Sequence, residues 1–200
     1  VTTVGVAGTL SLEAKTGALT MTGSSQIKAP DSNIRVKAAG DINLGHLTAK
    51  HVSVISASGA VLNAVGSSHN VTAVKLRLHA DKALGVSQRP LTTAVDDLSA
   101  WITGNSASGI YITEADAVMV TEVSEIRVTQ LQADTSTLLV ADADQADLRS
   151  QHTGDIELKT VSGNITLRGG GDALAIACMK KKKWVSVSVV LNSPIKIFKT

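Results

Sequence analysis

Aromatic side chains are almost absent from this sequence of 200 residues. Rings make up 2% of the chain, and their positions are Trp101, Tyr111, Trp184 and Phe198. A core built on aromatic rings is therefore excluded. Proteins that bind single-stranded nucleic acid stack bases on such rings, so this function is not expected either.

Cysteine is nearly absent as well, because Cys178 is the single one. An internal disulfide is thus impossible, and neither the cysteine nor the five histidines show the spacing of a metal site. We therefore expect no metal and no cofactor. His79 follows an inward Leu78 in a strand pattern, so we interpret it as an ordinary outward-facing histidine.

Long hydrophobic runs are also missing. No stretch of about 18 uncharged apolar residues occurs, so no transmembrane helix is expected. The N-terminus does not resemble a signal peptide. Because the chain begins at Val1 inside a strand-like pattern, we interpret it as a fragment, and the missing leader then carries little weight.

Charge is distributed unevenly although the formal net charge is only +2. Residues 1–95 contain nine basic and four acidic residues, whereas residues 96–147 contain one basic and ten acidic residues. The last 21 residues add six lysines and no acid. Without that tail the chain is acidic, which argues against a nucleic-acid partner.

What the sequence does contain is β-branched residues and a recurring phrase. Valine, isoleucine and threonine number 22, 13 and 20, and such side chains favour strands. The phrase is a turn residue followed by apolar, polar and apolar residues. Copies occur at Gly8–Leu12, Asn33–Val36, Gly40–Leu44, His51–Val54, Leu76–Leu78, Gly109–Ile112, Ile126–Val128, Gly154–Leu158 and Gly163–Leu167.

The spacing of these copies favours one architecture over another. An antiparallel sandwich or barrel is the general alternative for many short strands. However, Leu10, Ile34, Val52 and Leu76 are separated by 24, 18 and 24 residues. A period near 20 predicts an all-β, right-handed parallel β-helix, in which each strand pairs with its counterpart one coil away.

We expect residues 1–179 to form about eight irregular coils, a rod about 40 Å long at about 4.8 Å per coil. The stretch 69–123 departs from the simple coil and is expected to resemble an insertion. Residues 91–101 and 139–149 each leave room for a short helical turn. Residues 180–200, which begin with four lysines, are interpreted as a divergent tail.

One stretch shows a resemblance to a known family. Residues 84–86 (LGV), 89–100 (RPLTTAVDDLSA) and 109–116 (GIYITEAD), with the phrases GTLSL, GDINL, GDIEL and GNITL, resemble the repeats of filamentous haemagglutinin-like bacterial exoproteins. Leu84 and Arg89 stand where the family prefers isoleucine and asparagine. The resemblance implies a right-handed parallel β-helix exported by two-partner secretion, through an outer-membrane partner. It also implies a secreted or cell-surface location and a role in adhesion.

Carboxylates were considered as catalytic or metal-binding groups. Asp96 with Asp97, and Glu114 with Asp116, supply the paired acids that glycoside hydrolysis needs. The Gly-His-Gly motif typical of pectinase-like enzymes does not occur, since Leu47 follows His46. We therefore assign no catalytic residue. Calcium is a further possibility for the acidic group that comprises Asp142, Asp144 and Asp147, but Thr153 stands where an EF-hand needs glutamate.

Three functions remain open at this point. The leading hypothesis is a structural or adhesive segment of a large exported bacterial surface protein. Its partner would be a receptor or glycan on a host or bacterial cell surface, with no nucleic acid involved. The alternatives are a polysaccharide-cleaving enzyme on the same scaffold and a self-polymerising scaffold. Fold alone does not decide among them.

Overall fold

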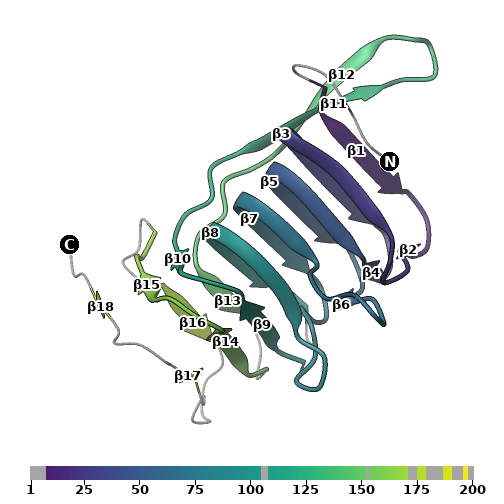
Figure 1. The fold of residues 1–200 in the computed structure, drawn as a ribbon. Helices are drawn as coiled ribbons and strands as arrows, with labels where there is room; N and C mark the ends of the chain where they lie inside the picture. Colours follow the sequence, from purple (N-terminus) through teal and green to yellow (C-terminus); the bar gives the residue numbers. More distant parts are fainter. Residues whose placement is uncertain are drawn as a thin grey trace.

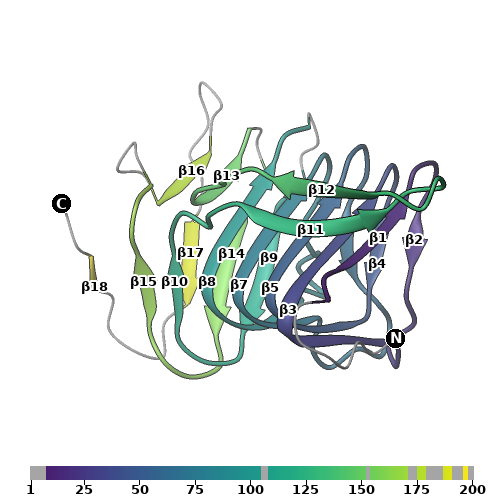
Figure 2. The same ribbon diagram turned by 90° about the horizontal axis from the view of Figure 1, so that it is seen from above.

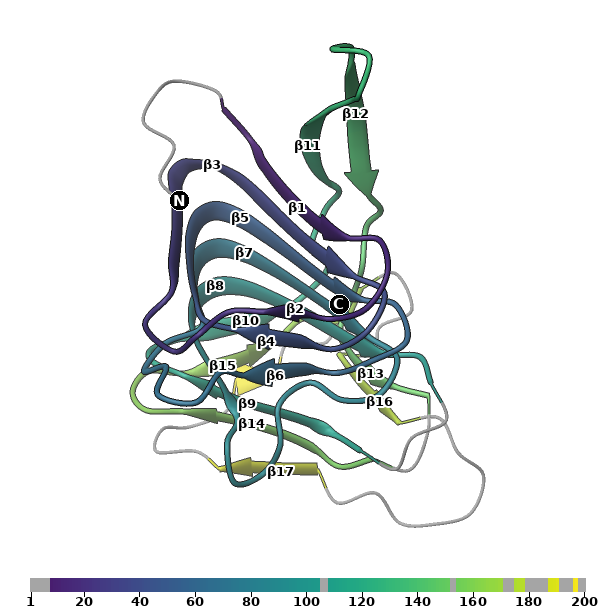
Figure 3. The ribbon, with the colours of Figure 1, turned by 90° about the vertical axis from the view of Figure 1, so that its right-hand side faces the viewer.

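A computed structural model describes residues 8–104, 108–151, 154–170, 175–178, 187–190 and 196–197. Every regular element in these ranges is a β-strand. The chain winds as a parallel β-solenoid of about five turns (Figures 1 and 3). The described residues contain no helix that could span a membrane.

Four long strands form one side of the solenoid: β3 (Gln26–Ala38), β5 (His46–Ser56), β7 (Val71–Ala80) and β8 (Leu91–Ile102). β1 (Leu10–Ala14) pairs with β3 at one end of this row. The short strands β2 (Leu19–Thr20), β4 (Ile42–Leu44) and β6 (Val61–Asn63) form a second face. The later strands are β9 (Ile110–Glu114), β10 (Val118–Val120), β13 (Leu148–Ser150), β14 (Ile156–Thr160), β15 (Ile165–Leu167), β16 (Ile176–Cys178), β17 (Val187–Val190) and β18 (Lys196–Ile197).

The register of the long strands confirms the spacing seen in the sequence. Leu10 pairs with Ile34, Ile34 with Val52, Val52 with Leu76, and Leu76 with Leu98. All these pairings are parallel, so the antiparallel sandwich is excluded. Ile34, Val52, Leu76 and Leu98 are fully buried. They form a column of stacked aliphatic groups inside the solenoid. Such a column leaves little space for aromatic rings, which is consistent with their rarity in the sequence.

One hairpin departs from the winding. β11 (Ile126–Leu131) and β12 (Thr137–Asp142) pair antiparallel and lie across the outside of the long strands (Figure 2). The sequence pattern predicts a coil strand for the phrase at Ile126–Val128. This prediction is wrong, because the phrase belongs to the hairpin. Alternation with period two is the same in a hairpin and a coil, so this phrase cannot distinguish them.

The hairpin interrupts a coil without shifting its register. Val120 of β10 pairs with Leu98, and Leu148 of β13 pairs with Ala100 two residues further along β8. Val120 and Leu148 thus pair with β8 as two residues of one continuous strand would, if they were two positions apart in sequence. The residues between them lie outside the winding. The structure has about five turns, and the expected eight coils are not confirmed.

The two short helical turns for which the sequence left room are not formed. Residues 91–101 lie within β8, and residues 139–149 contain the end of β12 and the start of β13, so neither forms a helical turn. The stretch 69–123 contributes β7, β8, β9 and β10, all in parallel pairings. Most of the tail at 180–200 lies outside the described residues.

Several of the recurring sequence phrases begin with glycine, because the backbones of neighbouring coils approach closely at the turns where these phrases start. A β-carbon on Gly109 would meet the carbonyl oxygen of Asp155, and one on Gly154 would meet that of Ser108. Neither position leaves space for a side chain. By contrast, a β-carbon on Gly8 would meet no atom within 4 Å.

We expect Gly109→Ala to lower the free energy of unfolding by about 1–3 kcal/mol, because the backbone of the neighbouring coil must move to make room. Gly8→Ala is the matched control and should change stability by less than about 0.5 kcal/mol. Urea denaturation of the two variants checks this. Equal midpoints for both variants would show that the corner is not closely packed.

Candidate ligand-binding surface

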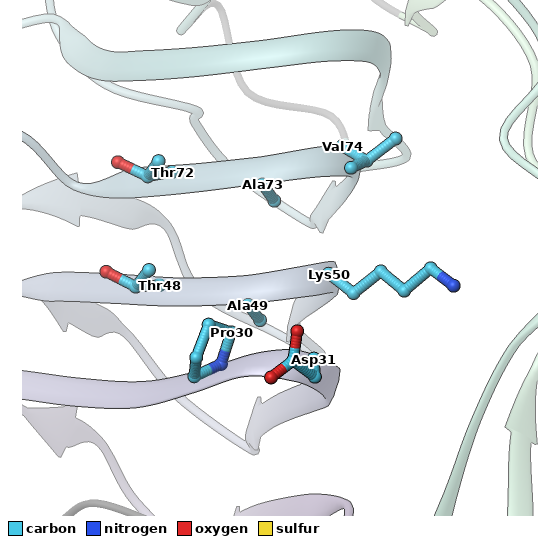
Figure 4. Close-up of a pocket in the computed structure, with 8 residues that line it drawn as sticks. All are labelled: Pro30, Asp31, Thr48, Ala49, Lys50, Thr72, Ala73 and Val74. Atoms are coloured by element: carbon cyan, nitrogen blue, oxygen red, sulfur yellow. The ribbon is translucent and has the colours of Figure 1, made fainter.

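A shallow groove crosses three neighbouring coils on the outer side of the long strands (Figure 4). It has a volume of about 490 Å³. It lies where β3, β5 and β7 bend, and its lining residues are Pro30, Asp31, Thr48, Ala49, Lys50, Thr72, Ala73 and Val74. Since the groove is open and spans several coils, its shape suits an extended ligand better than an enclosed small molecule.

The bend follows from small and irregular residues at this point of each strand. Ala49 and Ala73 are buried at the inner side of the bend, where a larger side chain would have to displace the core. In β3 the register against β5 shifts between Ala29 and Asn33. Pro30 lies in this shift, and a residue without an N–H is tolerated there because the ladder is already interrupted.

Two threonine hydroxyls line the groove, and two imidazole groups lie beside them. Thr48 and Thr72 are register partners in β5 and β7. The Nε2 atom of His46 lies 3.3 Å from the Thr72 Oγ1 atom and 3.5 Å from the Thr48 Oγ1 atom. The ring of His69 lies 6.4 Å from the ring of His46. These groups donate and accept hydrogen bonds on one surface.

Three lysines lie on or beside the groove, which also contains the carboxylate of Asp31. Lys28 is the register partner of Thr48, Lys50 lines the groove, and Lys75 is the register partner of His51. Burial lowers the pKa of His46, and nearby His69 and Lys28 lower it further. The pKa of His51 is lowered by burial, then by Lys75 and Lys50, while Asp97 opposes the shift. Burial is the main cause of the lowered pKa of both histidines, and the neighbouring positive groups add to it.

The acids considered from the sequence do not gather at this groove, apart from Asp97 beside Lys75. Asp142 accepts hydrogen bonds from Arg35 Nε at 3.0 Å. Asp144 accepts one from the backbone N–H of Glu125. Asp147 pairs with Arg149 at 2.8 Å and accepts from the Gly170 N–H. Each carboxylate is thus engaged in a different contact.

No group of three or more histidine, cysteine or acidic residues within the described ranges is arranged to hold a metal ion. Asp142, Asp144 and Asp147, considered above as a possible calcium site, are therefore not brought together as one set of free carboxylates. Asp96 is exposed on β8. His152 lies outside the described residues, and His79 points outward but is partly covered, with its ring 5.5 Å from that of Trp101.

Glu114 is a buried carboxyl group whose environment the sequence analysis missed. Its side chain is fully buried at the end of β9. It accepts hydrogen bonds from Thr93 Oγ1 at 2.6 Å, from the Val95 N–H at 3.1 Å and from the Ala115 N–H at 2.9 Å. Burial raises its pKa to about 7 despite these bonds. The signal was present, because Glu114 continues the inward alternation of Ile110 and Ile112.

No protein-family description, curated protein or solved structure matches the chain. The likeness to filamentous haemagglutinin-like exoproteins therefore rests on the sequence phrases alone.

Proposed function

We propose that the chain is a structural and adhesive segment of a large exported bacterial surface protein, and that the groove over β3, β5 and β7 binds acidic glycans on other cells. The observation that carries this proposal is the combination of an open groove with Thr48, Thr72 and Lys50 on its surface. Lysines attract carboxylate or sulfate groups of a sugar polymer, and threonine hydroxyls hydrogen-bond to its hydroxyl groups.

The solenoid contributes spacing. Adjacent coils lie about 4.8 Å apart, so the register partners Thr48 and Thr72 place two hydroxyl groups along the groove at this spacing. An extended polymer then makes several weak contacts at once, and several weak contacts on one chain produce a strong overall attachment. Export by two-partner secretion and a location at the cell surface belong to the same proposal, supported by the phrases at 89–100 and 109–116.

The polysaccharide-cleaving alternative receives less support. It needs one carboxyl group that donates a proton and a second one that acts as base or nucleophile. Asp142 and Asp147 each hold an arginine, and Glu114 is enclosed by backbone N–H groups. Glycan attachment needs none of these carboxylates, so it fits their observed contacts better.

A binding experiment tests the proposal with a heparin oligosaccharide as the acidic probe and neutral dextran as the uncharged one. We expect the chain to bind heparin more tightly than dextran, and increasingly so at low salt. Lys28→Glu combined with Lys50→Glu should weaken heparin binding about tenfold, since each exposed charge contributes up to about 1 kcal/mol.

Lys82→Glu provides the control, because Lys82 is an exposed lysine in the turn after β7 and does not line the groove. Isothermal titration at 50 and 200 mM salt measures all three proteins. The proposal fails if the double variant binds heparin as tightly as the unchanged chain, or if the unchanged chain binds neither probe.

A further inference from the structure

Three polar side chains are enclosed between the long strands and the hairpin. Arg35, Ser53 and Arg77 occupy the same register position on β3, β5 and β7. They therefore project from the outer face of neighbouring coils, where β11 and β12 cross (Figure 2). Their exposed fractions are 4%, 0% and 8%. Two guanidinium groups thus flank one hydroxyl in a place that water hardly reaches.

Only part of their hydrogen-bonding capacity is used. Arg35 Nε donates to both oxygens of Asp142 at 3.0 Å, and Arg77 Nε donates to the carbonyl oxygen of Ala143 at 3.1 Å. Arg35 Nη1, Ser53 Oγ and Arg77 Nη1 are buried without a hydrogen-bond partner. The nearest Glu13 oxygen lies 3.6 Å from Arg35 Nη1, which is beyond hydrogen-bond distance.

The charges around these atoms do not cancel. Asp142 pairs with Arg35, whereas Arg77 bonds to a neutral carbonyl and has no carboxylate of the described residues in contact. Glu13 is divided between Arg35 and Lys37. Burial lowers the pKa of Arg77, Arg35 lowers it further, and Asp142 opposes the shift. A buried positive charge without a negative partner is costly, so this enclosure favours a further negative charge.

We propose that Arg35, Ser53 and Arg77 bind a small inorganic anion the size of chloride beneath the hairpin. The three unpartnered atoms are all suitable donors, since the two guanidinium nitrogens and the serine hydroxyl each have a proton to give. Ser53 belongs to the middle coil, about 4.8 Å from the coils of Arg35 and Arg77. The anion supplies the missing acceptor to all three and balances the second guanidinium. This site is separate from the groove.

The proposal explains how the hairpin can cover two buried arginines although its Asp142 pairs with Arg35 alone. Asp142 and Ala143 lie at the end of β12, so the same guanidinium groups that would hold the anion also hold the hairpin. A buried water would also provide hydrogen bonds to the three atoms. It would leave the positive charge uncompensated, which makes the two occupants distinguishable by experiment.

Thermal unfolding of the full chain in sodium bromide and in sodium gluconate, at equal ionic strength, tests for the anion in solution. Above the dissociation constant we expect the midpoint to rise by about 3–5 °C for each tenfold increase in bromide. Arg77→Met should abolish this rise. Arg127→Met is the matched control, because Arg127 lies on the same hairpin but its side chain is 61% exposed, and it should retain the rise.

Two measurements keep the test decisive if Arg77→Met does not fold. Ser53→Ala removes only the hydroxyl and should reduce the bromide-dependent rise by at least half. Crystals of the unchanged chain grown in bromide should show an anomalous peak in contact with Arg35 Nη1, Ser53 Oγ and Arg77 Nη1. A water at this place, or equal midpoints in bromide and gluconate, would overturn the proposal.

Discussion

Asp142→Ala is expected to lower the free energy of unfolding by about 3–5 kcal/mol, because it leaves the buried guanidinium of Arg35 without its carboxylate. The side chains of Arg35 and Asp142 are only 5% and 6% exposed. Water therefore cannot replace the lost partner as it does for a surface pair. Chemical denaturation at pH 7 measures the loss.

Two further variants separate this effect from a general weakening of the hairpin. Arg35→Met combined with Asp142→Leu removes both charges of the pair and should recover most of the lost stability, since neither member of the pair is left alone. Asp144→Ala, two residues away, removes an exposed side chain that accepts one backbone hydrogen bond. It should cost about 1 kcal/mol. If Asp142→Ala costs no more than Asp144→Ala, the buried pair does not stabilise the fold.

The second large effect is a loss of stability with rising pH that comes from Glu114. Its pKa is about 7 in the folded chain, compared with an ordinary value of 4.5. The folded chain keeps this proton between pH 4.5 and 7, whereas the unfolded chain has released it. The stabilisation is therefore complete below pH 4.5 and lost as pH rises through 7, in total about 3 kcal/mol.

Glu114→Gln isolates this contribution. The glutamine oxygen can accept from Val95 and Ala115 while its amide donates to Thr93, so the variant imitates the protonated acid. We expect it to match the unchanged chain at pH 4, below the ordinary pKa, and to exceed its stability by about 3 kcal/mol at pH 8. Asp116→Asn, at an exposed position two residues along, should show no such difference.

The comparison between variant and unchanged chain is necessary because other groups titrate in the same range. Burial lowers the pKa of His46, His51 and His79. For these groups the unfolded chain binds more protons, so their contribution rises as pH increases towards and through 6.5. The histidines thus oppose Glu114 in the dependence of total stability on pH. Their contribution is the same in both proteins, so it cancels when the stability of the unchanged chain is subtracted from that of Glu114→Gln. Parallel profiles for the two proteins would contradict the assignment to Glu114.

The stacking of coils was predictable because it depends on local spacing. Leu10, Ile34, Val52 and Leu76 recur near one period, and a parallel solenoid is the arrangement that places such residues in contact. The hairpin was not predictable in the same way. Its phrase at Ile126–Val128 alternates like a coil strand, and only pairing with the residues that follow distinguishes the two structures.

The candidate sites were predictable to a smaller extent. The excess of basic residues in 1–95 anticipated positive charge on the early coils, but not that Lys28, Lys50 and Lys75 lie around one bend. Arg35 and Arg77 stand at outward positions, where the alternation predicts exposure. They are buried because residues 107 and 66 positions further along the chain contact them from the hairpin and its end, and no local pattern predicts such a contact.

The way in which β10 and β13 share one partner strand has a consequence for variation of this chain. Val120 and Leu148 resume the same ladder on β8 whatever the path between them. The turn between β11 and β12 can accordingly be shortened, extended or exchanged without altering how later coils align, as long as Asp142 and Ala143 keep their contacts with Arg35 and Arg77. A scaffold of this kind acquires new recognition loops at low structural risk, and it offers protein engineers a natural graft point.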